Sequence, residues 1–154
     1  MAHDYLFEVG YKPGITDPVG QGLKNDITHL GLGRMKNVHS AQLYKVSGQL
    51  SEDEQDRIAK DLLCDPILNE VRESDSARQD KSLVIDVWYK AGVTDVVSDS
   101  VQKGIKDLNI QGVQDVRTGM RYHLVGVTRR EVAEKIAAAL LSNPQVHEST
   151  IHAD

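Results

Sequence analysis

The residue types that support catalysis or metal binding are present in this chain, but their spacing does not suit either task. The six histidines show neither the HExxH pattern nor any other ligand spacing, and no CxxC pair exists. A GxSxG nucleophile elbow and a Walker-type glycine loop are also missing from the sequence. We read the single cysteine, Cys64, as a small buried residue at a helix end, with a nucleophile as the less favoured alternative. We therefore expect no catalytic residue, no metal site and no cofactor bound by this chain.

One stretch of the chain occurs twice. The segment YKPGITDPVG (Tyr11–Gly20) recurs 78 residues later as YKAGVTDVVS (Tyr89–Ser98). The same offset continues without a gap to Glu70 and Glu148. Because solenoid repeats have periods of only about 20–50 residues, this one is a duplicated domain-sized unit. The expected organisation is a first repeat over 1–72, a linker over 73–82 and a second repeat over 83–154.

Each repeat shows the same predicted order of elements, namely strand, helix, strand, strand, helix and strand. This order predicts an α+β fold of two tandem β-α-β-β-α-β, ferredoxin-like repeats, with antiparallel sheets and helices on one face. In the first repeat the elements are a strand at Leu6–Tyr11, a helix capped by Thr16 or Asp17, strands at Met35–Ser40 and Gln42–Leu50, a helix opened by a Ser51–Glu54 capping box, and an edge strand at Ile67–Val71. In the second they are strands at Leu83–Tyr89, Val113–Thr118 and Arg121–Val127, with a second capping box at Thr128 and Glu131.

The two repeats are expected to pack on each other. A repeat of this size buries too little surface to be robust alone. One sheet face would still expose Phe7, Val9 and Tyr44 in the first repeat, or their equivalents in the second. We therefore expect one pseudo-twofold body in which the repeats meet face to face.

The two copies differ in complementary places. The first contains Lys12-Pro13-Gly14 and Asp17-Pro18, whereas the second loses both prolines but gains two arginines between Val116 and Tyr122. Either the two faces have acquired different tasks, or exposed loops have drifted neutrally, and the sequence leaves both open. If the tasks differ, long charged side chains beside turns are the best candidates for partner contacts. These candidates are Lys12, Asp17, Arg117 and Arg121, although Asp17 is equally well explained as a helix cap.

The bulk composition excludes several classes of function. A net charge of −5 and a pI of about 5.6 argue against a nucleic-acid partner, which would require a basic face. No apolar run approaches the ~18 residues of a membrane span, and the N-terminus does not read as a signal peptide. A single cysteine fits a reducing compartment, so we expect a cytoplasmic protein without membrane contact.

Several short motifs, in order along both repeats, resemble a known family. Lys12-Pro13-Gly14, Asp17-Pro18-x-Gly20, the helix end at Leu30-Gly31 and the Val-Arg-x-Gly stretch at Val116–Gly119 look like the small PurS subunit of phosphoribosylformylglycinamidine synthase. That subunit pairs with itself. A tandem copy in one chain is similar to the N-terminal region of the large single-chain synthase, which mimics the pair.

The resemblance implies a part in a glutamine-dependent ligase of purine biosynthesis. That complex takes ammonia from glutamine and uses ATP to convert formylglycinamide ribonucleotide to formylglycinamidine ribonucleotide. It further implies a non-catalytic assembly subunit or N-terminal domain that bridges the synthetase and glutaminase components, with ATP and Mg held by the synthetase. Homo-oligomer formation stays open. The alternative is a small-molecule sensor for amino acids or nucleotides, by analogy with paired ferredoxin-like units.

Overall fold

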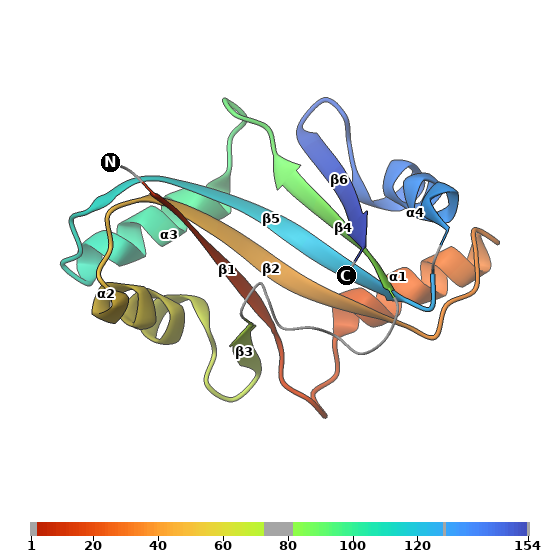
Figure 1. Ribbon diagram of the computed structural model, residues 1–154, viewed down its shortest axis with the longest axis horizontal. Coiled ribbons are helices and arrows are strands. Elements are labelled where there is room, and N and C mark those ends of the chain that lie inside the picture. Colours follow the sequence, from red (N-terminus) through yellow and green to blue (C-terminus); the bar gives the residue numbers. More distant parts are fainter. Residues whose placement is uncertain (1–2, 73–81, 128, 154) are drawn as a thin grey trace.

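The strands of the two repeats form one six-stranded antiparallel sheet in the order β3-β1-β2-β5-β4-β6 (Figure 1). The computed structural model describes residues 3–72, 82–127 and 129–153. β3 and β6 lie at the two edges, which confirms the predicted edge strand of the first repeat. The strands are β1 (His3–Tyr11), β2 (Asn37–Gly48), β3 (Asn69–Arg72), β4 (Ser82–Tyr89), β5 (Val113–Val125) and β6 (His147–Ala153).

The first three helices begin where the sequence places capping residues, whereas the fourth follows Arg129, which makes no side-chain cap. Asp17 caps the first helix by accepting a hydrogen bond from the Gly20 amide, and the Ser51–Glu54 capping box is present. Of the second predicted capping box, Thr128 lies outside the described residues. The helices are α1 (Pro18–His29), α2 (Glu52–Arg57) with its π-helical continuation η1 (Ile58–Leu63), α3 (Val96–Asp107), and α4 (Arg130–Ile136) with its continuation η2 (Ala137–Leu141).

The α+β class, the antiparallel sheet and the tandem repeats are confirmed, but the central hairpin predicted in each repeat is wrong. β2 runs without a break through Ala41, and β5 runs through Gly119. Ala41 pairs with Gly10 of β1 on one side and with Arg121 of β5 on the other, so no turn can form there. Each repeat therefore contributes one long strand where the sequence predicted two short ones.

The repeats join along the edges of their sheets, through β2 and β5, so the expectation that they meet face to face is wrong. In this antiparallel pair Gln42 lies opposite Met120, and these two positions are equivalent in the repeats because they are 78 residues apart. The pseudo-twofold axis therefore passes through this residue pair. Pairing β2 with β5 hides the two edges that isolated repeats would expose.

The helices of both repeats cover the same face of the sheet and exchange partners across the axis. η1, the continuation of α2 in the first repeat, shares one apolar cluster with α3 of the second. α1 of the first shares the other cluster with α4 and η2 of the second (Figure 1). Phe7 and Val9, predicted to need covering by the second repeat, lie in the cluster that includes Val101 and Ile105 of α3. Neither repeat therefore has a complete core by itself.

Two further expectations concern the linker between the repeats and contact with a membrane. The expected linker, 73–82, falls almost entirely on residues outside the described ranges. Within those ranges, no helix is long and apolar enough to cross a membrane.

Candidate functional site: an ion network across the repeat junction

The repeated Tyr-Lys motif ties each repeat's first loop to the end of its second helix. Lys12 Nζ donates to the Pro66 carbonyl at 2.6 Å, and Lys90 Nζ donates to the Pro144 carbonyl at 2.5 Å. The glycine of each loop adopts a positive φ, 84° at Gly14 and 83° at Gly92, which a side chain would strain. The motif thus recurs because both repeats need the same loop conformation.

Asp17 connects the start of α1 to the central strand β2. Its carboxylate accepts from the Ser40 amide at 2.6 Å and from the Ser40 hydroxyl at 2.7 Å, in addition to capping the helix. Asp95 makes the equivalent contacts with the amide and hydroxyl of Thr118. These bonds fix each long helix against the sheet, so the observed contacts of this aspartate build the fold.

Arg117 lies on β5 and binds residues of its own repeat at the surface. Its guanidinium donates to Glu148 at 2.7 Å and to the Tyr89 carbonyl at 2.8 Å. The Arg117 side chain keeps 32% of its surface exposed. Its hydrogen bond and positive charge lower the pKa of the Glu148 carboxyl.

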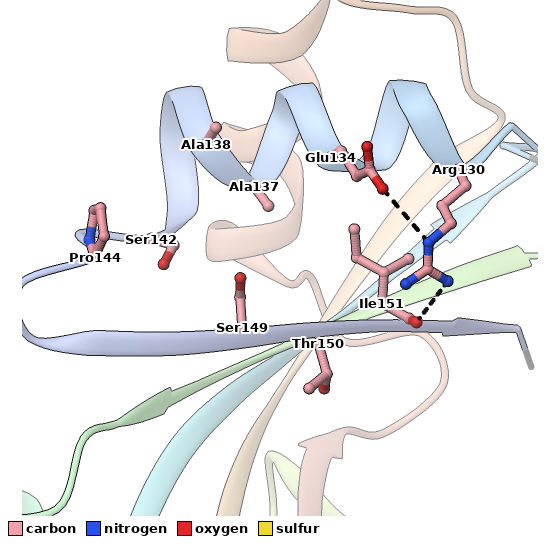
Figure 2. A pocket seen from close by; sticks show the side chains of 9 residues that line it. All are labelled: Arg130, Glu134, Ala137, Ala138, Ser142, Pro144, Ser149, Thr150 and Ile151. Carbon is pink, nitrogen blue, oxygen red and sulfur yellow. Dashed lines mark hydrogen bonds and ion pairs between the residues drawn. The ribbon is translucent and has the colours of Figure 1, made fainter.

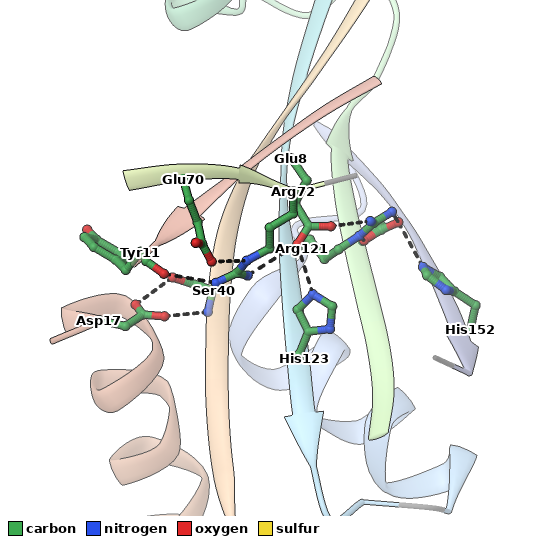
Figure 3. Close-up of polar contacts among 10 residues, drawn as sticks. Glu8, Tyr11, Asp17, Ser40, Glu70, Arg72, Arg121, His123 and His152 are labelled. Carbon is green, nitrogen blue, oxygen red and sulfur yellow. Dashed lines mark hydrogen bonds and ion pairs between the residues drawn. The ribbon is translucent and has the colours of Figure 1, made fainter. Parts of the chain in front are cut away.

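Arg121 lies four residues further along β5, but only 11% of its side chain is exposed, and it joins the two repeats (Figure 3). It donates to both oxygens of Asp86, at 2.7 and 2.9 Å, and to Glu8 of the first repeat at 2.7 Å. To reach Glu8 on β1, the side chain must cross β2, which lies between β1 and β5. Its cross-strand neighbour on β2 is Ala41, whose small side chain leaves room for the guanidinium.

Other basic groups complete the network around the two carboxylates. His123 Nε2 lies 3.3 Å from Glu8, and Arg72 Nη1 lies 3.4 Å from the same carboxylate. His152 Nε2 lies 3.0 Å from Asp86. Glu8 and Asp86 are equivalent positions of the two repeats, and both are buried on the sheet face opposite the helices.

The network shifts the pKa values of Glu8 and Arg121 in the directions that keep both side chains charged. Burial alone would raise the pKa of Glu8, but hydrogen bonds and charge from His123 and Arg121 outweigh it and lower the pKa to about 2. The hydrogen bonds from Arg121 to Asp86 raise the pKa of the guanidinium despite its burial. A carboxylate that ionises so readily is a poor proton carrier near neutral pH, so the network suits stable charge pairing better than acid–base chemistry.

Cys64 lies at the end of η1, as predicted, but it is half-buried where the sequence predicted a buried residue, and desolvation by burial raises the pKa of its thiol. Within the described ranges no group of three or more His, Cys, Asp or Glu side chains is arranged to hold a metal ion.

A groove of about 620 Å³ lies between α4–η2 and the edge strand β6 (Figure 2). Small side chains such as Ala137, Ala138 and Ser149 line it. Its one arginine, Arg130, donates to the Ile151 carbonyl at 3.1 Å and lies 3.5 Å from Glu134. The polar groups at this end of the groove therefore already have partners within the chain.

The four sequence candidates end up in different surroundings. Lys12 and Arg117 lie at the surface, whereas Asp17 and Arg121 are engaged in internal contacts. The structure brings none of the four together. Sequence reasoning missed Glu8 and Asp86, although a signal was present: both repeats carry an acid at the same position inside an otherwise apolar strand.

A family model matches the same two repeats of the chain. The model of the PurS family, described as phosphoribosylformylglycinamidine (FGAM) synthase, matches residues 6–74 and again residues 82–154. No curated protein sequence matches the chain. Among solved structures, the PurS subunit of formylglycinamide ribonucleotide amidotransferase from Methanocaldococcus jannaschii is similar, at 20% identity and a TM-score of 0.38 over 48% of this chain and 95% of that chain. Because the family model covers both repeats, the chain belongs to the PurS family of FGAM synthase components in purine biosynthesis, with two copies of the family's domain in tandem.

Proposed function

We propose that this chain is a non-catalytic assembly component of FGAM synthase, either a subunit or an N-terminal domain, that bridges the synthetase and glutaminase components. The observation that carries the proposal is the family match over each of the two repeats. In this arrangement the synthetase holds ATP and Mg, and this chain binds neither.

The use of the polar side chains supports a structural role. The charged groups Glu8, Asp86 and Arg121 bind one another, and the motif residues Asp17 and Asp95 bind the backbone and side chains of the central strands. These charged side chains stabilise the fold through contacts within the chain, which is consistent with a structural role in an assembly.

The proposed contact residues for the partners are the four sequence candidates. Their exposure separates those that can touch a partner directly from those that cannot. Lys12 and Arg117 lie at the surface beside loops, where partner contacts concentrate. Asp17 and Arg121 would act on a partner through the fold they stabilise.

Size-exclusion chromatography of the chain with the synthetase and glutaminase components, at micromolar concentrations with glutamine and Mg-ADP, tests the proposal. We expect one co-eluting complex and its loss or weakening in Lys12→Ala or Arg117→Ala. Arg129→Ala, which removes an exposed arginine on the same repeat as Arg117, is the control. Failure of the unmodified chain to co-elute would refute the assembly role. Calorimetric binding of an amino acid or nucleotide to the isolated chain would favour a sensor instead.

A further inference from the structure

The buried acids of the two repeats differ in which repeat supplies their basic partners. Asp86, in the second repeat, takes its contacts from Arg121 and His152 of its own repeat. Glu8, in the first repeat, takes its 2.7 Å contact from Arg121 and a 3.3 Å contact from His123, both in the second repeat, and has only the longer 3.4 Å contact with Arg72 from its own repeat. The buried acid of the first repeat therefore depends on groups that its own repeat does not supply.

The equivalent positions in the first repeat show what it lacks. Where the second repeat has Arg121 and His123, the first has Leu43 and Lys45. Leu43, at the position of Arg121, has no donor to replace the three directed bonds that the guanidinium makes to two carboxylates. A pair of two first repeats would thus bury two glutamates that keep the 3.4 Å contact with Arg72 but lack Arg121.

On the same face of the sheet, the two repeats also differ in the side chains that pack at the junction. The indole of Trp88 lies against Gly119, where an added Cβ would come within 2.9 Å of the ring. Gly119 is the cross-strand neighbour of the fully buried Leu43. The equivalents of Trp88 and Gly119 in the first repeat are Gly10 and Ala41, so two first repeats would also lack this indole beside Leu43.

We propose that the first repeat's half of the β2–β5 junction accepts a second-type repeat and rejects a copy of itself. Arg121 and Trp88 are the residues that determine this pairing preference. The partner is the second repeat of the same chain, or that of another copy in an exchanged dimer. The inference concerns pairing between repeats and does not rest on the proposed function.

The first test uses the intact chain and a double-mutant cycle between the repeats. Glu8→Gln, Arg121→Met and the double variant are compared with the unmodified chain by urea unfolding. We expect the two effects on the unfolding equilibrium constant to be coupled by at least about tenfold. Arg117→Met, which removes a surface arginine from the same strand, should show coupling to Glu8→Gln below about twofold. Additive effects at Glu8 and Arg121 would overturn the proposal.

The second test replaces the second repeat by a copy of the first within a chain of two repeats. We expect this chain to unfold at a lower urea concentration than the natural one. Its unfolding equilibrium constant in the absence of urea should be larger by at least about tenfold. Installing Gly10→Trp, Ala41→Gly and Leu43→Arg in its second copy should recover at least half of the lost urea concentration at the unfolding midpoint. A like-repeat chain as stable as the natural one overturns the proposal, and so does failure of the three substitutions to recover stability.

Discussion

Glu8 is expected to make the stability of this protein depend on pH. In the folded chain its pKa is about 2, against an ordinary value of 4.5. Because the folded state binds this proton less tightly than the unfolded state, Glu8 contributes stability above about pH 4.5 and loses it as the pH falls toward 2. A shift of this size corresponds to about 3 kcal/mol of unfolding free energy, and more than half of that is lost by about pH 3.

The assay is urea unfolding of the natural chain and of Glu8→Gln at several pH values between 7 and 2. We expect the variant to be less stable near neutral pH, and the difference between the two proteins to shrink as the pH falls. Taking the difference removes the contributions of the other acids. Glu148→Gln is the control, since Glu148 also binds an arginine of β5 but is largely solvent-exposed. A stability difference that is the same at pH 7 and pH 3 would refute the assignment of a lowered pKa to Glu8.

Three further substitutions test the fold. Asp17→Ala removes the cap of α1 and both bonds to Ser40, so thermal unfolding should show a loss of about 2 kcal/mol, with Asp17→Asn losing less. Ile58→Ala empties a fully buried site and should cost about 2–5 kcal/mol in urea unfolding, and a loss below about 1 kcal/mol would contradict the packing. Gly119→Ala places a Cβ 2.5 Å from a backbone oxygen and should cost about 1–3 kcal/mol. It should also shift the fluorescence of Trp88, the only tryptophan, whereas an unchanged emission maximum would argue against the indole's position.

Local signals in the sequence predicted the helices well. Asp17 and Ser51 fix the starts of α1 and α2 because their side chains satisfy amide groups that no helical carbonyl can reach. Gly20 lies inside α1, where glycine is unfavourable, and the close approach of β2 requires it, since an added Cβ would collide with the Val38 carbonyl oxygen. Gly22 has open space around it, and nothing in the structure explains it.

The candidate site was much less predictable. Arg117 and Arg121 have the same residue type and lie four positions apart on one strand, so local spacing provides no reason to expect different surroundings for them. The structure places one at the surface and the other at the junction, because the neighbours of Arg121 on β2 and β1 are the small residues Ala41 and Gly10. Which strand lies beside which is a long-range property, so the partners of Arg121 could not be read from local spacing.

The sequence by itself determined that the chain is a duplication, since the 78-residue offset is a property of residue order alone. It also determined the class of each repeat and the capping of its first helices, which depend on neighbours within a few residues. Only the tertiary structure decided that β2 pairs with β5, that the helices exchange between repeats, and that Glu8 depends on Arg121. These features join residues more than 30 positions apart, and their free energy comes from burial and charge pairing that exist only once both repeats have folded together.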